Sequence, residues 1–290
     1  MKREGRTHGL RSEKLPTLRD RYALGARGLT VSPFCLGITN DPRTVCEAFD
    51  AGINFFFVTA DMHWPLYESL RRGLEMLFSR GGGVRDDVVV GAVSYVTQPE
   101  FCFAPFREVI DAVRGLERLE VTIAGGAYST DLAIRLTQYR QHAAGVVPGA
   151  RAVGTSFHDR AAAFLALEHA MIDIGFVRYN SDHTGAQRDL FPHITNGAPL
   201  LYNFKNTSGH VAEKLAPRLG VEEGSWVPRA TDHYRYVLTR AEIDGVLCAL
   251  TTPGQVKELA AAMDEGPLAA EECEYVEELT RRMRRGVANG

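Results

Sequence analysis

The sequence predicts a (β/α)8 barrel, a cylinder of eight parallel strands surrounded by helices. Three observations favour it: short apolar runs alternate with segments of helical periodicity, no linker or change of composition marks a second domain, and polar residues follow the apolar runs. The expected strands are residues 34–38, 53–58, 88–93, 121–124, 152–155, a run within 172–179, 200–204 and 246–250.

The second of these runs, in GINFFFVTA at 52–60, illustrates the strand signal. Its apolar residues are consecutive, and the run is too short for a helix. A strand of a parallel sheet is buried on both faces and therefore has this pattern. The run ends shortly before Asp61, His63 and Trp64. The carboxyl end of a barrel strand is where enzymes of this fold place their chemistry.

The segments between the strands carry helix signals. Asp41 and Pro42 supply an N-cap and a first-turn proline, and Gly52 ends that helix. Leucines recur at helical spacing from residue 66 to 77, and further helices are expected at 106–113, 130–143, 160–169, 229–240, 255–263 and 271–284. A small hairpin is expected at 22–31. A doubly wound sheet is the alternative, disfavoured because no GxGxxG turn follows the first strand.

Composition limits the classes of partner. The chain of 290 residues has a formal net charge of −3, so neither nucleic acid nor an anionic membrane is expected to bind it. No apolar run is long enough to span a membrane. The five cysteines show no CxxC spacing and are interpreted as reduced thiols of a cytoplasmic protein. Residues 1–20 are expected to form a basic, poorly ordered tail, and residues 21–290 a single barrel.

The polar residues at the strand ends are the candidates for a site. Since the carboxyl ends of barrel strands meet at one rim, these side chains are expected to gather there. They are Asp61, His63, Ser94, Tyr95, Tyr128, Ser156, His158, Asp159, Arg160, Arg178, Tyr179, Asn180, His183, Asn203, Lys205, Thr251 and Thr252.

Several segments resemble the aldo-keto reductases, from Tyr22 to about Met263. They are LGARGLTVSPFCLG at 24–37, GINFF at 52–56 with TA at 59–60, VRDDVVVGAV at 84–93, RAVGTS at 151–156 and TTPGQVKEL at 251–259. GTSFHDR and VRYNSDHTGAQRDLFP also look like a branch of that family. The resemblance implies the (β/α)8 barrel and an ancestral NADPH-dependent reduction of carbonyl groups.

The resemblance also implies a redox tetrad of Asp, Tyr, Lys and His, which this sequence does not retain. Val58 is assigned to the position of the Asp and Val93 to that of the Lys. His63 takes the position of the Tyr if Thr59 and Ala60 anchor the alignment, and Met62 takes it if Gly52 does. Gly125 or Gly126 replaces the His. Losing both charged members removes the electrostatic preorganisation of the proton transfer, so hydride chemistry of the family type is not expected.

The residues that the resemblance implies for a nicotinamide dinucleotide are only partly kept. Thr251, Thr252 and Gln255 remain, Lys257 could meet a phosphate, and Ser156, after the fifth strand, is also assigned to cofactor binding. Equally, TTPG can serve as the capped start of the last barrel helix. NADP(H) is therefore compatible with the sequence but not required by it.

His63 is the principal catalytic candidate, because an imidazole can take or give a proton near neutral pH. Asp61, Tyr95 and His158 are predicted to assist it, while Asp159 is expected to cap a helix. Substrate binding is assigned to Trp64, Tyr128, Arg178, Asn180, Asn203 and Lys205, with Arg178 or Lys205 anchoring an anionic group. Asp61, His63, His158 and His183 could converge on a metal ion, but no ligand spacing supports one and no metal is predicted. The other six histidines, His233 among them, are interpreted as surface or helix residues.

Three functions follow. The first is acid-base chemistry without net hydride transfer, such as a dehydration, isomerisation or cyclisation of a small polar carbonyl metabolite. The second is an NAD(P)H-dependent reductase in which His63 donates the proton. The third is a catalytically silent barrel that binds a ligand or serves as a subunit. The oligomeric state is not indicated by the sequence.

Overall fold

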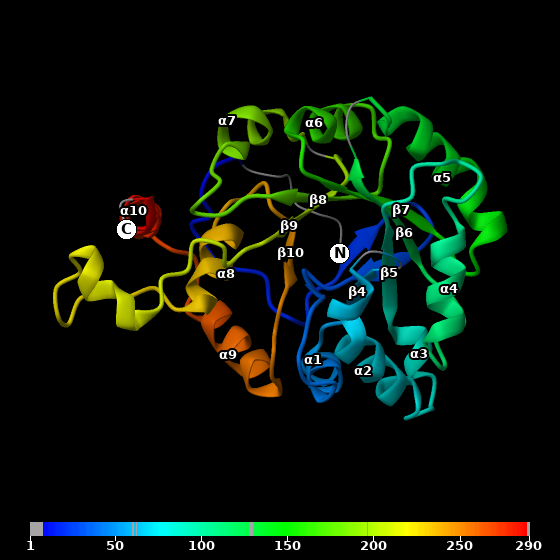
Figure 1. The fold of residues 1–290 in the computed structure, drawn as a ribbon, viewed down its shortest axis with the longest axis horizontal. Coiled ribbons are helices and arrows are strands. Elements are labelled where there is room, and N and C mark those ends of the chain that lie inside the picture. Colours follow the sequence, from blue (N-terminus) through cyan, green and yellow to red (C-terminus); the bar gives the residue numbers. More distant parts are fainter. Residues whose placement is uncertain (1–7, 60, 62, 128–129, 196, 289–290) are drawn as a thin grey trace.

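Eight parallel strands close into a barrel in the computed structural model, which describes residues 8–59, 61, 63–127, 130–195 and 197–288 (Figure 1). The strands are β3 (Phe34–Leu36), β4 (Phe55–Thr59), β5 (Val89–Ser94), β6 (Val121–Ala127), β7 (Ala152–Phe157), β8 (Ile174–Arg178), β9 (Leu200–Phe204) and β10 (Gly245–Cys248). Neighbours along the chain pair in parallel, and β10 closes the barrel on β3. The predicted (β/α)8 barrel is confirmed.

Helices follow the strands, and most of them cover the barrel on its outside. They are α1 (Arg43–Ala51), η1 (Trp64–Tyr67), α2 (Glu68–Phe78), α3 (Val84–Asp87), α4 (Ala104–Ala112), α5 (Leu132–Val146), α6 (Arg160–Glu168), α7 (Ala186–Asp189), η2 (Phe191–His193), η3 (Glu213–Leu219), α8 (Ala230–Leu238), α9 (Pro253–Asp264) and α10 (Ala270–Ala288). β1 (Tyr22–Leu24) and β2 (Leu29–Val31) form the predicted antiparallel hairpin. Asp159 is the N-cap of α6, as expected, because its carboxylate accepts a hydrogen bond from the Ala161 N–H.

Aromatic side chains fill the interior of the barrel. The Phe55 ring lies 6.4 Å from Phe176 and 5.9 Å from Tyr202, and Phe57 lies 5.2 Å from Phe176. Phe55, Phe176 and Tyr202 are fully buried. Rings from three strands therefore form a packed core beneath the carboxyl ends of the strands.

The segment before the hairpin differs from the expected tail. Leu15 and Leu18 are buried, and the Arg11 side chain donates hydrogen bonds to the carbonyl oxygens of Leu238 and Ile243, both at 2.8 Å. Leu10 also bridges to Arg240. Apolar leucines between the basic residues give this segment a surface to bury, so residues 8–20 pack on the barrel and the expectation of a disordered tail is wrong for them.

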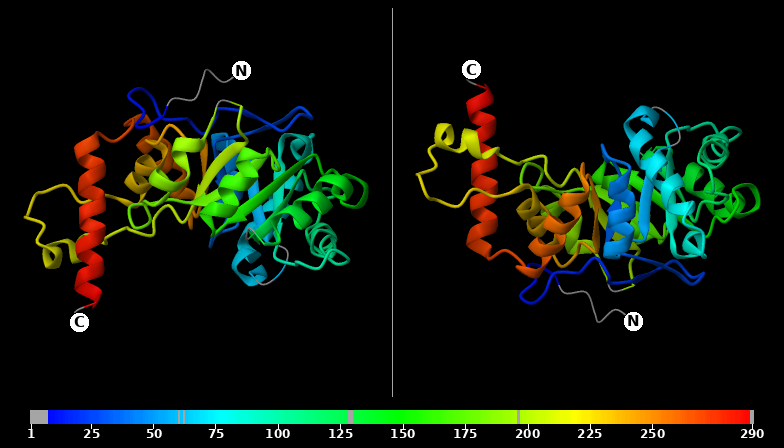
Figure 2. Two further views of the ribbon diagram at one scale, coloured as in Figure 1. Left: turned by 90° about the horizontal axis from the view of Figure 1, so that it is seen from above. Right: turned by 90° about the horizontal axis from the view of Figure 1, so that it is seen from below.

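α10 and the segment 205–229 lie together at one edge of the molecule (Figure 2). The Tyr275 hydroxyl donates to the Trp226 carbonyl, and the Ser181 and Thr280 hydroxyls lie 2.8 Å apart. The predicted extra C-terminal helix is thus confirmed, and its apolar side is covered in part by the long connection after β9.

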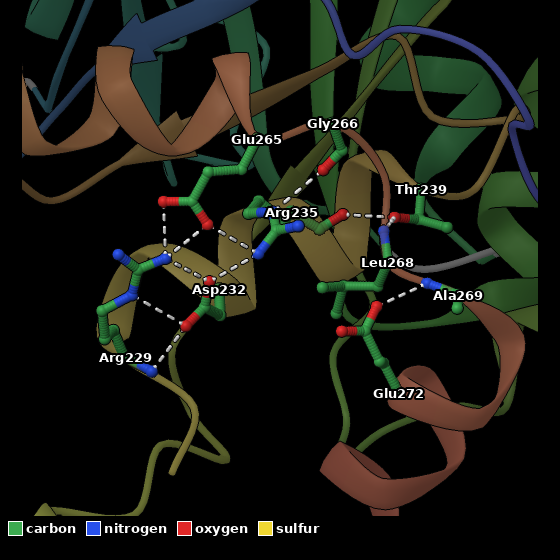
Figure 3. Close-up of polar contacts among 9 residues, drawn as sticks. All are labelled: Arg229, Asp232, Arg235, Thr239, Glu265, Gly266, Leu268, Ala269 and Glu272. Atoms are coloured by element: carbon green, nitrogen blue, oxygen red, sulfur yellow. Dashed lines mark hydrogen bonds and ion pairs between the residues drawn. The ribbon is translucent and has the colours of Figure 1, made fainter. Parts of the chain in front are cut away.

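An ion-pair network joins α8 to the turn between α9 and α10 (Figure 3). The Asp232 carboxylate accepts hydrogen bonds from the side chains of Arg229 and Arg235, and both arginines also pair with Glu265. Arg235 donates in addition to the Gly266 carbonyl. These contacts fix the point from which α10 leaves the barrel.

The structure also bears on features that the composition addresses. All five cysteines are free thiols, and four of them are buried. No described helix is long and apolar enough to cross a membrane. Among the described residues, no group of three His, Cys, Asp or Glu side chains is arranged to hold a metal ion.

Candidate active site

A cavity of about 290 Å³ lies at the mouth of the barrel, where the carboxyl ends of the strands meet. Among the predicted site residues, His63, Tyr95, Ser156, His158 and Lys205 line it. The rest of the lining is mainly apolar: Ile38, Phe57, Thr59, Leu66, Tyr67, Val93, Phe176, Phe204, Leu247, Cys248 and Ala249. The volume is at the lower end of the range for ligand pockets, roughly 300 to 1,000 Å³, and suits a small molecule.

His63 and Tyr95 are neighbours in this cavity. Their ring centroids are 5.2 Å apart, and both side chains are partly exposed to it. His63 precedes η1, and its carbonyl accepts a hydrogen bond from Leu66 at the start of that helix. Tyr95 follows the last residue of β5. Two groups that can exchange protons therefore face one volume from neighbouring strands.

Asp61 holds the backbone at Tyr95 rather than facing the cavity. Its carboxylate accepts a hydrogen bond of 2.6 Å from the Tyr95 N–H, and the Thr59 hydroxyl lies 3.5 Å from the same carboxylate. Asp61 is not among the residues that line the cavity. It therefore positions Tyr95 and adds a negative charge beside the phenol.

The Tyr95 hydroxyl is kept protonated by its surroundings. Burial raises the pKa of Tyr95, the charge of Asp61 raises it further, and a hydrogen bond with the Ser156 side chain opposes them. The Ser156 hydroxyl also accepts a hydrogen bond from the Gly126 N–H at 3.1 Å. Near neutral pH, Tyr95 is consequently a proton donor and not a base.

The absence of a side chain at Gly125 makes room for Tyr95. A Cβ atom at Gly125 would lie 2.7 Å from the Tyr95 ring and 2.8 Å from Val93. No side chain fits there without moving the tyrosine. The position of the Tyr95 ring, just after β5, therefore requires a glycine at residue 125 on β6.

The interior position on β4 belongs to Phe57 and not to Val58. Phe57 and Thr59 both line the cavity, and successive strand residues point to opposite faces, so Val58 faces the helices. Val58, which the resemblance places at the position of the Asp, therefore does not line the cavity, and its assignment to that position stays a prediction. Val93, assigned by the resemblance to the position of the Lys, lines the cavity.

Two further predicted residues, His158 and Lys205, line the same cavity from the ends of the strands β7 and β9. His158 follows β7, its ring lies 5.5 Å from that of Phe204, and it lines the cavity together with Lys205. Burial lowers the pKa of His158, and the charges of Lys205 and Arg178 lower it further. Its imidazole is consequently held neutral.

Three predicted binding residues contact the scaffold. Trp64 lies beneath the Arg71 guanidinium, 3.4 Å from its ring centroid, and does not line the cavity. Asn203 is buried, accepting from the Tyr179 N–H at 2.6 Å and donating to Asn206. These contacts engage the buried Asn203 within the scaffold and correct its prediction, whereas the half-buried Trp64 has one ring face covered by Arg71 and its role in binding stays a prediction.

Asn180 is corrected in the same way. It is fully buried, its amide donates to the Lys205 carbonyl at 2.7 Å, and its oxygen accepts from the Asp182 N–H. The residue joins the loops after β8 and β9. Tyr128, also assigned to substrate binding, lies outside the described residues.

The predicted dinucleotide segment makes contacts of its own. The Gln255 side-chain oxygen accepts hydrogen bonds from the Thr251 N–H and hydroxyl, and Lys257 pairs with Glu47 at 3.4 Å. Thr252 is the N-cap residue of α9. None of these four residues lines the cavity at the barrel mouth.

Sequence reasoning missed the apolar residues of the site. Phe57, Phe176 and Phe204 line it from β4, β8 and β9. Strand alternation offers a signal, because residues two apart on a strand share a face: Phe57 and Thr59 share one face of β4, and Phe176 and Arg178 share one face of β8. When both faces of a strand are buried, both carry apolar residues, so the sequence of that strand does not indicate which face points into the barrel.

The structure was compared with known proteins. No protein-family model and no curated protein matches the sequence. Among solved structures, the holo form of the aldo-keto reductase AKR11C1 from Bacillus halodurans is similar, with 14% identity and a TM-score of 0.68 over 90% of this chain and 96% of that one. Its apo form gives 14% identity and a TM-score of 0.64 over the same shares of the two chains.

A third solved structure agrees with these. PA4992 from Pseudomonas aeruginosa, which carries the same family name, is 18% identical with a TM-score of 0.60 over 86% of this chain and 97% of that one. Likeness at such low identity shows the fold and not the reaction. The chain therefore has the barrel fold of the aldo-keto reductases.

Proposed function

We propose that the barrel mouth catalyses proton transfer on a small carbonyl metabolite without net hydride transfer, as in a dehydration, isomerisation or cyclisation. The observation that carries this proposal is the pairing of His63 with Tyr95, with ring centroids 5.2 Å apart, over a cavity whose inward strand positions hold Phe57 and Val93. No carboxylate among the described residues lines that cavity.

The roles follow from the surroundings of each group. Because the pKa of Tyr95 is raised by burial, its hydroxyl donates a hydrogen bond or proton to the substrate carbonyl oxygen. His63 removes a proton from the carbon next to that carbonyl. The proton returns to another carbon in an isomerisation, or hydroxide departs as water in a dehydration. Asp61 and Ser156 act by positioning Tyr95.

The residues predicted to hold a nicotinamide dinucleotide make contacts within the chain. Gln255 is engaged by Thr251 and Lys257 by Glu47, so binding would have to break these contacts. The cavity of about 290 Å³ suits a smaller molecule. These observations support a reaction in which the side chains of the chain itself move the protons.

The test is hydrogen exchange at carbon. The protein is incubated in deuterated water with a panel of small aldehydes and ketones, without cofactor, and deuterium entering next to the carbonyl is followed by NMR. Exchange above the buffer rate is expected, falling about 100-fold in His63→Gln, within the usual contribution of a general base. His142→Gln, at an exposed histidine of α5, is the matched control. Equal exchange in wild type and His63→Gln would refute the assignment.

The second candidate is an NAD(P)H-dependent reductase with His63 as proton donor, favoured by the likeness to a structure solved in a holo form. It predicts tight binding of the reduced dinucleotide and its oxidation when a carbonyl compound is added. A thermal shift and a nicotinamide fluorescence titration distinguish the two. The third candidate, a silent binding barrel, predicts neither exchange nor oxidation.

A further inference from the structure

Three nitrogen-bearing side chains stand at the ends of three adjacent strands. His158 follows the last residue of β7, Arg178 is the last residue of β8, and Lys205 follows the last residue of β9. Phe157 pairs with Val177, and Arg178 pairs with Phe204, so the three residues lie at neighbouring positions of the barrel rim. His158 and Lys205 line the cavity, and Arg178 ends the strand between them, next to the lining residues.

Arg178 is directed to the inner side of the rim. It lies two residues after Phe176, which lines the cavity, and residues two apart on a strand share a face. Its Nε atom is buried and makes no hydrogen bond to any described residue. Buried donors are normally satisfied, and this guanidinium nitrogen has no acceptor among the described residues.

The acids of the neighbouring loops are engaged elsewhere. Asp182 pairs with Arg284 and lies 3.2 Å from His183, and Asp159 caps α6. In the described part of the chain, no ion pair joins a carboxylate to Arg178 or Lys205. The rim beside the cavity therefore carries positive charge without a countercharge.

The two histidines nearby respond to this charge. Burial is the largest cause that lowers the pKa of His158, and the positive charges of Lys205 and Arg178 lower it further. Burial is also the largest cause that lowers the pKa of His183, and the charge of Arg178 is the next. Asp182 raises this pKa, while the charges of Arg284 and Lys205 lower it further. The left-handed backbone at Lys205, with φ of 58°, holds a non-glycine residue at this position of the rim.

We propose that the substrate carries an oxyanion, a carboxylate or a phosphate, which Arg178 and Lys205 bind at the β8–β9 side of the mouth. This inference rests on the proposed function, in which the same cavity holds the substrate. The apolar body of the ligand lies over Phe57, Phe176 and Phe204, and its carbonyl end reaches His63 and Tyr95. A guanidinium binds either oxyanion through paired hydrogen bonds.

Binding of matched probes tests the proposal. Phenylacetate, phenyl phosphate and the neutral 2-phenylacetamide are titrated by calorimetry into wild type, Arg178→Gln, Arg178→Lys, Lys205→Gln and the control Lys214→Gln, at an exposed lysine of η3. At least one anion is expected to bind about tenfold or more tightly than the amide and to weaken about tenfold in Arg178→Gln and Lys205→Gln. The stronger of the two anions identifies the oxyanion. Arg178→Lys should restore part of the affinity.

Other results would overturn the inference. Equal binding of anions and amide, or equal weakening in Lys214→Gln, would show that Arg178 and Lys205 form no specific site. Thermal unfolding checks that Arg178→Gln is folded. A failure of the anion-site proposal can be told apart from a failure of the proposed function. If hydrogen exchange depends on His63 but anions are not preferred, only the anion site is refuted. Anion binding that depends on Arg178 without exchange removes only the proton-transfer chemistry.

Discussion

At the scale of single residues, the site depends on Tyr95 and the groups around it. Asp61 accepts a hydrogen bond from its backbone N–H, Ser156 contacts its hydroxyl, and Gly125 leaves space for its ring. Each of these residues acts through the tyrosine. Mutations of them should therefore change its position or its pKa before they change anything else.

The charge of Asp61 can be separated from its hydrogen bond by Asp61→Asn. The asparagine oxygen can still accept from the Tyr95 N–H, but the negative charge is removed. Since that charge raises the pKa of Tyr95, the pKa is expected to fall towards its ordinary value while remaining raised by burial. NMR of labelled tyrosine, assigned with Tyr95→Phe, measures it. An unchanged or higher pKa would contradict this description.

At the scale of elements, two helix glycines can be compared: packing requires one of them despite its low helix propensity, and not the other. Gly73 in α2 faces α1: a Cβ atom there would lie 2.4 Å from Val45 and 2.5 Å from the Pro42 carbonyl. Gly145 in α5 has no atom within 4 Å of that position. The α1–α2 contact therefore requires a glycine at 73, and nothing requires one at 145.

The two glycines give a matched prediction. Gly73→Ala is expected to lower the free energy of unfolding by about 1 to 3 kcal/mol through overpacking. Gly145→Ala is expected to raise it by up to about 1 kcal/mol, the helix-propensity difference. Denaturant unfolding at constant slope measures both. A destabilised Gly145→Ala or a neutral Gly73→Ala would show that the α1–α2 packing is described incorrectly.

A second element, α8, contains a histidine that the sequence assigned to the surface or to a helix, and that lies buried on this helix. His233 is 2% exposed, its ring lies 5.4 Å from that of His210, and neither of its ring nitrogens bonds to a described group. Burial lowers the pKa of His233 to about 4, His210 lowers it further, and Asp232 opposes this. The neutral imidazole is thus part of the folded state.

Acid should consequently destabilise the protein through His233. Because its pKa is lowered in the folded state, its contribution is fully present above the ordinary value of 6.5 and is lost as the pH falls towards 4. The loss is roughly 3 kcal/mol at the lower limit. His233→Leu should flatten this part of the stability curve, measured by denaturant unfolding at several pH values, while the exposed His169→Gln should not.

At the scale of the whole molecule, segments distant in the chain close the structure. Residues 8–20 pack beside the loop between α8 and β10, and α10 leaves the barrel at the network around Asp232 (Figure 3). The barrel itself closes by pairing β10 with β3. Arg11 contributes to this closure because it bonds the carbonyls on either side of the loop that leads into β10.

Arg11→Gln should therefore destabilise the whole barrel and not only a terminus. Loss of its two hydrogen bonds is expected to cost about 1 to 3 kcal/mol in the free energy of unfolding. The exposed Arg27→Gln in the hairpin serves as control and should be close to neutral. Equal stability of wild type and Arg11→Gln would show that residues 8–20 do not contribute to closure.

Much of the fold could be predicted because its signals are local. Each strand is a short apolar run and each helix an amphipathic one, so all eight strands and the main helices were placed from the sequence. The gathering of His63, Tyr95, Ser156, His158 and Lys205 followed from the rule that strand ends meet at one rim. The buried asparagines could not be separated from ligand-binding residues, because partners of both come from other loops of the barrel.

The sequence by itself determined the order of strands and helices, the closed barrel and the rim at which polar side chains collect. Only the tertiary structure decided which face of β4 points inward, and so placed Phe57 and Thr59 in the cavity. It also decided which polar groups are already paired, as for Asn180 and Gln255, and which have no partner in the described part of the chain, as for the Nε of Arg178. The reason is physical: periodicity is a property of neighbours in the chain, whereas facing and pairing depend on contacts that form when the barrel closes.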